Sequence, residues 1–467
     1  MTVMNGTPRL ERLTTSDRFL LLWDDLGWSA DIGAIAVLDG AELLDSDGVV
    51  RIEAVRRWLE PRLHRIPHAR QLLHRPRWWL GGPLWIDAPS LDLAQQVRVH
   101  PVGPPGDEPQ LLRACAELAG RRLDPGRPLW EMWLLPGLPQ GRIGMFLRLH
   151  HVVADGAAAV AAFGSLLEST VDAPDPAAPS WTPTPVPTVG QLLRDNLRRH
   201  AHRLGRGLAG VAHAKDTLRR TRRAWPAWRE LLAEQRAPRT SLNRPVGADR
   251  RLAILRSRLE PIIQIAHAHD AKVNDVVLAA VTGGLRELLA GRGERVEWLV
   301  LRAMVPVSLL REQHSQEGGG NQDGWMVVPL PLGEPDAVRR LDMIKVQTSA
   351  RKRKARPQTG SGISRSMLLQ RAFLHGFAHQ RFFNTSVTNV PGPPVPLYLS
   401  GAQLLELFPV VSLMGNLALA VAVFSYNGQL NLTAIADQNA CPDVDTFIRG
   451  TRTALDDLAQ SLSVRGI

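Results

Sequence analysis

Cysteine is almost absent from the sequence. Its 467 residues include only Cys115 and Cys441, which lie far apart in the chain. Two such cysteines exclude a disulfide framework and a thiolate metal cluster, and they favour a reducing cytoplasm. Hydrophobic residues make up 44% of the chain and charged residues 22%, which is typical of a folded globular protein of two or three domains.

Long hydrophobic runs are also missing. The longest uncharged region, from Leu407 to Ala436, is interrupted by proline, glycine and asparagine. It never reaches the ~18 consecutive apolar residues of a membrane-spanning helix. The N-terminal residues carry charge where a secretory signal needs an apolar core. We therefore expect a cytoplasmic protein whose contact with membranes is peripheral.

Basic residues outnumber acidic ones and give a net charge of +11. Thirteen Lys or Arg and four Asp or Glu lie between Gln191 and Arg239, and a second basic run covers Arg351 to Arg356. Such density is typical of phosphate-bearing partners, which include nucleic acid, an anionic membrane and a phosphorylated cofactor, or simply of a solvated helix face. Few aromatic residues accompany the arginines, which disfavours nucleic acid.

Six prolines between Asp172 and Thr188 predict an extended connector, because proline interrupts helices and central strands. On both sides of the connector, strand-like runs alternate with helix-like runs. The sequence therefore predicts an α/β (mixed α+β) fold with two similar halves. We place the N-terminal half in residues 1–172, the connector and a basic helical arm in residues 173–247, and the C-terminal half in residues 248–467.

Individual elements are predicted from their periodicity. The runs "IGAIAVLD" and "IGMFLRLHHVV" are typical of strands, and "KVNDVVLAAVTGGLRELLAG" is typical of a strongly apolar helix. The sequence "YNGQ", Tyr426 to Gln429, predicts a hairpin turn, because Asn-Gly tolerates the positive φ angles of a tight turn.

The stretch "GMFLRLHHVVADG", Gly144 to Gly156, ends an apolar strand with two adjacent histidines. Side chains alternate between the two faces of a strand, so His150 and His151 point in opposite directions and do not act as a pair. A neutral imidazole can take a proton from a hydroxyl or an amine, which makes His151 a candidate general base. Gly156 would form the turn beside it, and Asp155 would pair with His151 or with an arginine.

Residue types alone leave other roles open for this motif. A histidine pair at a strand end is often structural. A metal site would use His150, His151 and Asp155, joined by His267 to Asp270, but the opposite orientations and the missing Cys or Glu ligands argue against it. The sequence has no glycine-rich phosphate loop and no nucleophile elbow. We expect neither a metal nor a bound cofactor.

"HHVVADG" resembles the HHxxxDG motif of acyltransferases that use coenzyme A or carrier-bound acyl groups. Further segments resemble the bacterial wax ester synthase/diacylglycerol acyltransferase family and occur in the order found there: "LDPGRPLWEMWLLPGL", "VNDVVLAAVTGGLRELL", "VPVSLLR", "GNQDGWMVVPLP" and "TNVPGP". The resemblance extends from about Leu13 to the C-terminus. It implies two chloramphenicol-acetyltransferase-like halves with the active site in a channel between them.

The resemblance also implies roles for the motif residues. His151 would be the general base that deprotonates the acceptor hydroxyl for attack on the acyl thioester. His150 would matter less, and Asp155 would be structural, paired with an arginine for which Arg70 is a candidate. No acyl-enzyme is needed.

The oxyanion of the intermediate needs a hydrogen-bond donor at the centre of the channel. The candidate substrate-binding residues are Asn274, Ser386, Thr388 and Asn389. Asn274 could instead cap the helix that begins there, and Asn389 could set up a turn before Pro391.

The predicted function is transfer of an acyl group from acyl-CoA, a substrate and not a cofactor, to diacylglycerol or a long-chain fatty alcohol. The expected partners are these substrates and the surface of an anionic membrane or a lipid droplet. One alternative is transfer to a glycolipid or polyketide hydroxyl, and a second is a non-catalytic basic module that binds membranes. Asp31 stands where family members usually carry a histidine, and Asp323 with Gly324 replaces small or apolar residues. Both departures bear on acceptor preference.

Overall fold

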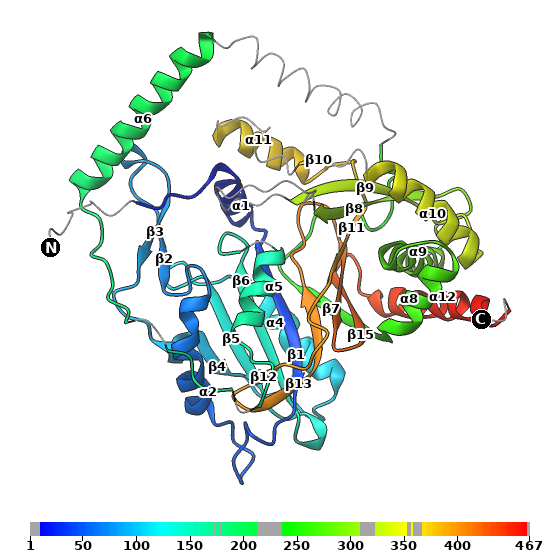
Figure 1. The fold of residues 1–467 in the computed structure, drawn as a ribbon. Helices are drawn as coiled ribbons and strands as arrows, with labels where there is room; N and C mark the ends of the chain where they lie inside the picture. Colours follow the sequence, from blue (N-terminus) through cyan, green and yellow to red (C-terminus); the bar gives the residue numbers. More distant parts are fainter. Residues whose placement is uncertain are drawn as a thin grey trace.

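Two twisted sheets lie side by side, each with helices of its own half on one face (Figure 1). The computed structural model describes residues 10–154, 156–171, 173–177, 180–212, 236–308, 323–352, 356–357 and 367–464. All structural statements below concern these residues.

The first sheet has six strands in the order β12-β13-β1-β6-β5-β4. Its strands are β1 (Asp31–Leu38), β4 (Val97–Val99), β5 (Trp130–Leu135), β6 (Ile143–His150), β12 (Tyr398–Leu399) and β13 (Ala402–Val410). A separate hairpin pairs β2 (Gln71–His74) with β3 (Leu84–Asp87). The helices of this half are α1 (Thr15–Asp25), α2 (Ile52–Leu59), η1 (Glu60–Arg65), η2 (Trp78–Leu80), α3 (Leu93–Gln96), α4 (Glu108–Gly120), η3 (Pro139–Gly141) and α5 (Gly156–Ser165).

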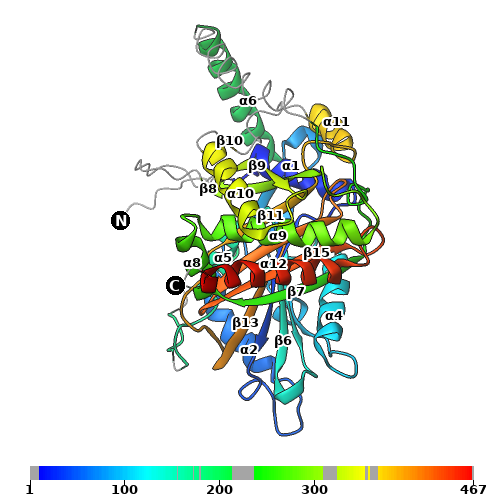
Figure 2. The ribbon, with the colours of Figure 1, turned by 90° about the vertical axis from the view of Figure 1, so that its right-hand side faces the viewer.

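The second sheet has seven strands in the order β10-β9-β8-β11-β14-β15-β7. They are β7 (Arg250–Arg258), β8 (Val300–Ser308), β9 (Asp323–Pro331), β10 (Arg356–Pro357), β11 (Thr385–Val390), β14 (Leu419–Tyr426) and β15 (Gln429–Asp437). The remaining helices are α6 (Val189–Ala212), α8 (Leu259–Ala268), α9 (Val273–Gly291), α10 (Ala337–Lys352), α11 (Met367–Phe377) and α12 (Val444–Val464). Figure 2 shows α8, α9 and α12 in front of this sheet.

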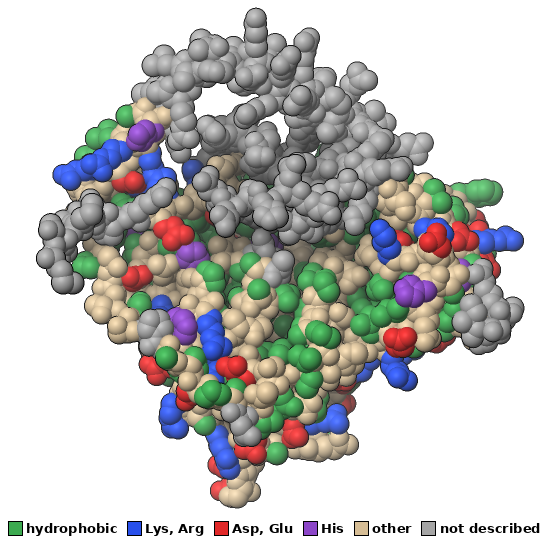
Figure 3. All heavy atoms as spheres, in the orientation of Figure 1, with side chains coloured by type: hydrophobic (Ala, Val, Ile, Leu, Met, Phe, Trp, Pro, Cys, Tyr) green, Lys and Arg blue, Asp and Glu red, His purple; other side chains and the backbone are tan. Residues whose placement is uncertain are grey.

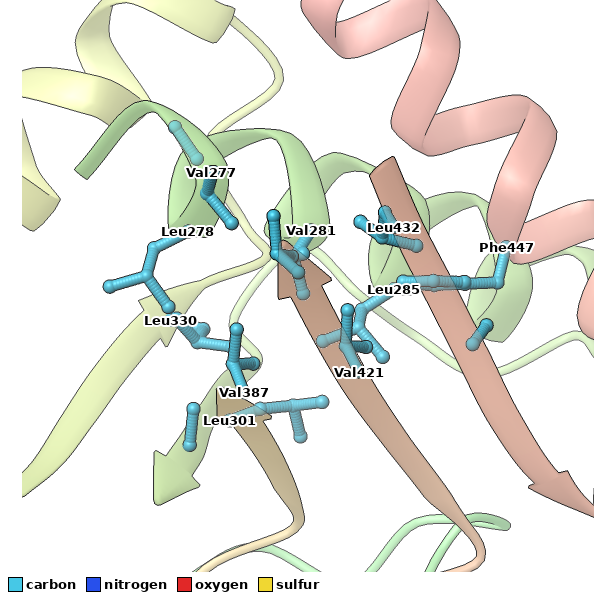
Figure 4. Close-up of a cluster of buried hydrophobic side chains, with 14 of the residues drawn as sticks. Val277, Leu278, Val281, Leu285, Leu301, Leu330, Val387, Val421, Leu432 and Phe447 are labelled. Atoms are coloured by element: carbon cyan, nitrogen blue, oxygen red, sulfur yellow. The ribbon is translucent and has the colours of Figure 1, made fainter. Parts of the chain in front are cut away.

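The apolar helix α9 forms the centre of the second half. Its side chains Val281 and Leu285 point toward Leu301, Val421 and other residues of the strands below (Figure 4). From the other side α12 packs closely on the same helix, so α9 is apolar on most of its surface. This explains why the run has the length of a helix and almost no polar face.

Strand β6 is buried along its whole length. Met145, Leu147 and Leu149 belong to the core that the first sheet forms with α2, α5 and η1. Phe146, on the other face, packs between the two halves against residues of β7 such as Leu252. The alternation predicted from the sequence is therefore confirmed, and the face of β6 that carries the even-numbered residues looks toward the second half.

Most predicted elements are confirmed in type and place. The predicted strands correspond to β1 and β6, and the apolar helix corresponds to α9. The hairpin turn joins β14 to β15, with φ of 44° at Asn427 and 76° at Gly428. The described residues of the proline-rich connector form neither helix nor strand, and the basic arm begins as α6. Residues 213–235 of that arm and 353–355 of the second basic run lie outside the described residues.

One arrangement was not predicted from the sequence. Strand β13, within the range assigned to the C-terminal half, pairs antiparallel with β1 in the first sheet. The Tyr426 hydroxyl of β14 stabilises the crossing, because it donates to the Leu404 carbonyl at 2.9 Å and accepts from the Leu397 N–H at 2.9 Å. The two halves are joined by this crossing segment as well as by the connector.

The close approach of α9 and α12 generates a prediction. A Cβ atom at Gly284 would lie 2.6 Å from the Phe447 carbonyl oxygen of α12. We expect Gly284→Ala to lower the free energy of unfolding by about 1–3 kcal/mol, measured by thermal and urea denaturation. Gly164→Ala in α5 is the control, because a Cβ there has no neighbour within 4 Å and alanine favours helix. Equal destabilisation by both substitutions would contradict the packing described.

Candidate active site

His150 is held at both of its ring nitrogens. Nε2 lies 2.8 Å from Oδ2 of Asp24 in α1, and Nδ1 accepts a hydrogen bond from the Val152 N–H at 3.1 Å. A nitrogen that accepts carries no proton, so the neutral ring donates from Nε2 to the Asp24 carboxylate. The residue is only 3% exposed. His150 therefore fastens the end of β6 to α1, and neither nitrogen is available to a substrate.

His151 lies in the turn that follows β6. Its backbone N–H donates to the Ala30 carbonyl at 2.8 Å, which places the turn beside the start of β1, and the residue is partly exposed. The turn continues with a bond of 2.9 Å from the Val153 N–H to the His150 carbonyl. The two histidines of the motif thus have different surroundings, as their alternation predicts.

Of the other two motif residues, only Gly156 lies among the described residues. Gly156 is the first residue of α5, and Asp155 lies outside the described residues. Arg70, the candidate partner of Asp155, donates to the Glu60 carbonyl at 2.9 Å and lies over the ring of Trp181. The pairing of Asp155 with an arginine stays a prediction.

A buried ion-pair network surrounds Arg148, two residues before His150 and on the same face of β6. Arg148 Nε lies 2.7 Å from Oε1 of Glu131 on β5, and Nη1 lies 3.1 Å from Oδ2 of Asp31 on β1. The side chain is 2% exposed and also donates to the Arg121 carbonyl. One guanidinium group therefore connects three neighbouring strands.

The buried position of Asp31 changes the pKa of its carboxyl group. Burial raises the pKa of Asp31 above its ordinary value, and the neighbouring Arg148 guanidinium acts in the opposite direction. Ser29 Oγ also donates to Asp31 at 2.6 Å. The cavity beside Asp31 and Arg148 measures only about 20 Å³, which is far below the size of a substrate pocket. The network is therefore structural.

Asp24, Glu131 and Arg148 were not among the residues singled out from the sequence. A signal was present, because Arg148 is the one charged residue within the apolar strand "IGMFLRLH". A buried charge requires a partner of opposite sign, which predicts a carboxylate on an adjacent strand. The sequence did not indicate which carboxylate, since β1, β5 and β6 are far apart in the chain.

The four candidate oxyanion residues fall on two sides of the second sheet. Ser386 and Thr388 of β11 share a face with their respective β14 partners Ala420 and Ala422, which pack between the two halves. Asn389 lies on the opposite face with Val387, whose side chain packs in the core formed with α9. The same helix carries the fourth candidate, Asn274, in its first turn. The structure therefore brings Ser386 and Thr388 together and separates them from Asn389.

The start of α9 is capped by a neighbour of Asn274. The Asp275 carboxylate accepts from the Lys272 N–H at 3.0 Å and from the Thr348 hydroxyl at 2.7 Å. Asp275, rather than Asn274, therefore supplies the capping interaction. Among the described residues, no group of three or more His, Cys, Asp or Glu side chains is arranged to hold a metal ion.

The network around Arg148 predicts a pH-dependent loss of stability. Arg148→Met removes the cation beside Asp31, whereas Glu131 keeps Arg98 as a partner. Removing one member of a buried ion pair costs roughly 3–5 kcal/mol. The raised pKa of Asp31 means that its favourable contribution is present below its unfolded value of 3.8 and is lost as pH rises through the folded value. Without Arg148 the pKa of Asp31 rises further, so the difference in melting temperature from wild type should widen as the pH rises above 3.8. Arg449→Met, at an exposed position of α12, is the control; equal melting of both variants at pH 8 would contradict the network.

Comparisons with known proteins agree with this architecture. Residues 13–277 match the family model "Wax ester synthase/diacylglycerol acyltransferase catalytic domain", and residues 319–459 match "WS/DGAT C-terminal domain". The Mycobacterium tuberculosis protein described as "Probable diacyglycerol O-acyltransferase tgs1" is 31% identical over 456 residues, which cover 96% of this chain and 95% of the relative.

Two solved structures share the fold. The wax ester synthase/diacylglycerol acyltransferase from Marinobacter aquaeolei VT8 aligns with a TM-score of 0.68 at 23% identity, covering 96% of this chain and 99% of that chain. The starter condensation domain of rhizomide synthetase in complex with C8-CoA aligns with a TM-score of 0.58 at 17% identity, covering 96% and 95%. The predicted fold of two halves is confirmed. The chain belongs to the wax ester synthase/diacylglycerol acyltransferase family and is an acyltransferase.

Proposed function

We propose that the protein transfers an acyl group from acyl-CoA to the hydroxyl of a lipid alcohol, with His151 as the general base. The observation that carries this proposal is the difference between the two histidines of the motif. Both ring nitrogens of His150 are occupied by Asp24 and Val152, whereas His151 is partly exposed in the turn after β6. Of the two side chains, that of His151 is the more exposed, which supports its assignment as the base.

In the proposed reaction one proton moves from the acceptor hydroxyl to His151 and then to the sulfur of coenzyme A. His151 takes the proton of the acceptor hydroxyl while the hydroxyl oxygen attacks the thioester carbonyl. The tetrahedral intermediate then collapses, its C–S bond breaks, and the imidazolium donates the proton to the departing thiolate of coenzyme A. Thr388 is the favoured donor to the oxyanion, because it is partly exposed on the face of β11 that looks toward the first half.

We propose diacylglycerol as the acceptor, with a long-chain fatty alcohol as the alternative. The support is the relative described as a diacylglycerol O-acyltransferase, which this chain matches over 95% of that relative's length. Asp31, at the position where the family usually has a histidine, is buried against Arg148. Any effect of Asp31 on acceptor preference is therefore indirect and acts through the packing of β1.

Contact with a lipid surface is proposed for the start of α6. Here Trp78, Trp79, Val189, Leu193 and Leu197 form an exposed apolar group, which we call the α6 patch; Trp78 is 90% and Leu197 61% exposed. A bond of 2.9 Å from Asn196 Nδ2 to the Trp79 carbonyl and the burial of Leu192 against Leu80 and Leu84 hold α6 on η2.

Exposed Arg194 and Arg198 flank the α6 patch, and the helix projects from the body of the protein (Figures 1 and 3). Tryptophan favours the membrane–water interface, and basic side chains are attracted to anionic lipid. None of the described helices combines the length and the apolar character needed to span a membrane.

We expect His151→Ala to lower kcat by ~10²–10⁴-fold, the usual effect of removing a general base. His150→Ala should reduce the melting temperature, because it removes the bond to Asp24, and should reduce turnover per folded molecule less. The assay follows the thiol released from palmitoyl-CoA in the presence of diacylglycerol. Cys115 and Cys441 are buried, and burial raises the pKa of Cys441 to about 12, so neither competes for the thiol reagent. Near wild-type turnover of folded His151→Ala would refute the proposal.

The α6 patch is tested with Leu193→Ser/Leu197→Ser. The partition coefficient into anionic vesicles, measured by sedimentation, should fall by at least about 100-fold, because each buried apolar side chain contributes about 1.5–3 kcal/mol to insertion. Activity on a short soluble alcohol should be unchanged. Met343→Ser/Val346→Ser is the matched control, because both residues are exposed on α10. Equal sedimentation of the two double variants would place membrane contact elsewhere.

A further inference from the structure

A second cavity, of about 400 Å³, lies in the second half of the protein, and no residue assigned to catalysis above lines it. Two segments form its walls: residues 237–244, before β7, and residues 379–381, before β11. Asn416, in the loop between β13 and β14, completes it. The volume is within the range of ligand pockets, roughly 300–1,000 Å³.

Positive charge dominates the lining of this cavity. Arg239, Arg244 and Arg381 contribute this charge, and none of the described lining residues is Asp or Glu. Arg381 is fixed by bonds from Nε and Nη2 to the Ala237 carbonyl at 3.2 and 3.0 Å. Arg239 and Arg244 are exposed, and neither forms an ion pair with a described carboxylate. Their guanidinium groups are available to an anion.

The walls are held in place by side-chain amides. Buried Gln380 donates from Nε2 to Oδ1 of Asn416 at 3.0 Å, and Asn416 Nδ2 returns a bond to the Gln380 carbonyl at 2.9 Å. Asn384 bridges the two segments, because its Nδ2 donates to the Pro238 carbonyl and to Oδ1 of Asn243, each at 2.8 Å. The cavity therefore exists before any ligand binds, which reduces the entropy lost on binding.

Two segments that line or support the cavity also lead to residues of the candidate active site. Asn384, which donates to the cavity residue Asn243, immediately precedes β11, so Ser386 and Thr388 follow along the strand at about 3.3 Å per residue. The loop that carries Asn416 also carries Ser412, whose hydroxyl donates to the Asp31 carbonyl next to Ala30. Ala30 in turn accepts the bond from the His151 N–H. A long ligand anchored in the cavity can extend along β11 toward the half that carries His151.

We propose that this cavity binds the phosphate groups of coenzyme A; the inference rests on the proposed acyl-CoA donor. Coenzyme A carries a diphosphate and a 3′-phosphate at the far end of a long pantetheine arm, so its phosphates and thioester occupy separate places. Guanidinium groups form charge-assisted, bidentate hydrogen bonds with phosphate oxygens. Diacylglycerol has no charge that would favour an arginine-lined cavity. An anionic phospholipid headgroup shares the phosphate chemistry, and the experiment separates the two sources.

The test variant is Arg239→Gln/Arg244→Gln, which removes two exposed cations and no described ion pair. We expect the Kd of coenzyme A, measured by titration calorimetry, to rise at least about tenfold. The KM for palmitoyl-CoA should rise in parallel with little change in kcat. Transfer from palmitoyl-N-acetylcysteamine, a thioester without phosphate, should be unaffected. Arg449→Gln/Arg452→Gln on α12 removes the same charge from exposed positions and should leave the Kd unchanged.

An unchanged Kd of coenzyme A in the Arg239→Gln/Arg244→Gln protein would overturn the assignment. So would a variant that binds coenzyme A normally and loses sedimentation with phosphatidylglycerol vesicles, since the cavity would then hold a lipid headgroup. The calorimetric measurement needs no acceptor and no turnover. A wild-type protein that binds coenzyme A through these arginines but transfers no acyl group would support the cavity and refute the proposed function.

Discussion

The buried guanidinium group of Arg148 is the interaction on which the arrangement around the histidines depends. A cation inside a protein needs carboxylates at close range, and here Glu131 and Asp31 supply them from the strands on either side of β6. The pairing fixes β6 in one register, because a shift by one residue would turn Arg148 toward the apolar core of the first half. Every other feature of the motif follows from that register.

The register gives two adjacent histidines different surroundings. With Arg148 facing the second half, His150 faces the same way and meets Asp24 of α1. His151 comes after the last residue of β6, where the chain turns and the Ala30 carbonyl holds its backbone. One imidazole thereby fastens the strand end, and its neighbour is partly exposed in the turn with its backbone held by Ala30. The role of general base proposed for His151 requires a fixed position, since proton transfer requires hydrogen-bond distances.

The local residue pattern made much of the fold predictable. Contacts between segments that are far apart in the chain could not be predicted from it. The periodicity of β6, the apolar length of α9 and the Asn-Gly turn at Asn427 each depend on neighbouring residues, so the sequence predicts them directly. The pairing of β13 with β1, the carboxylate partners of Arg148 and the two walls of the basic cavity join segments far apart in the chain. An apolar strand pairs equally well in either sheet, so its sequence alone does not identify its neighbour.

The pairing of β13 with β1 joins a strand that is synthesised late to one that is synthesised early. The ribosome releases β1, β5 and β6 early, and β13 follows only after most of the second sheet has been made. During that interval β1 is an edge strand with unpaired backbone groups, next to an apolar face meant for the second half. Nascent chains at this stage are prone to pair with one another, and chaperones that cover strand edges would act here. Although the molecule looks like two halves, the first sheet is complete only when β13, from the range of the second half, has paired with β1.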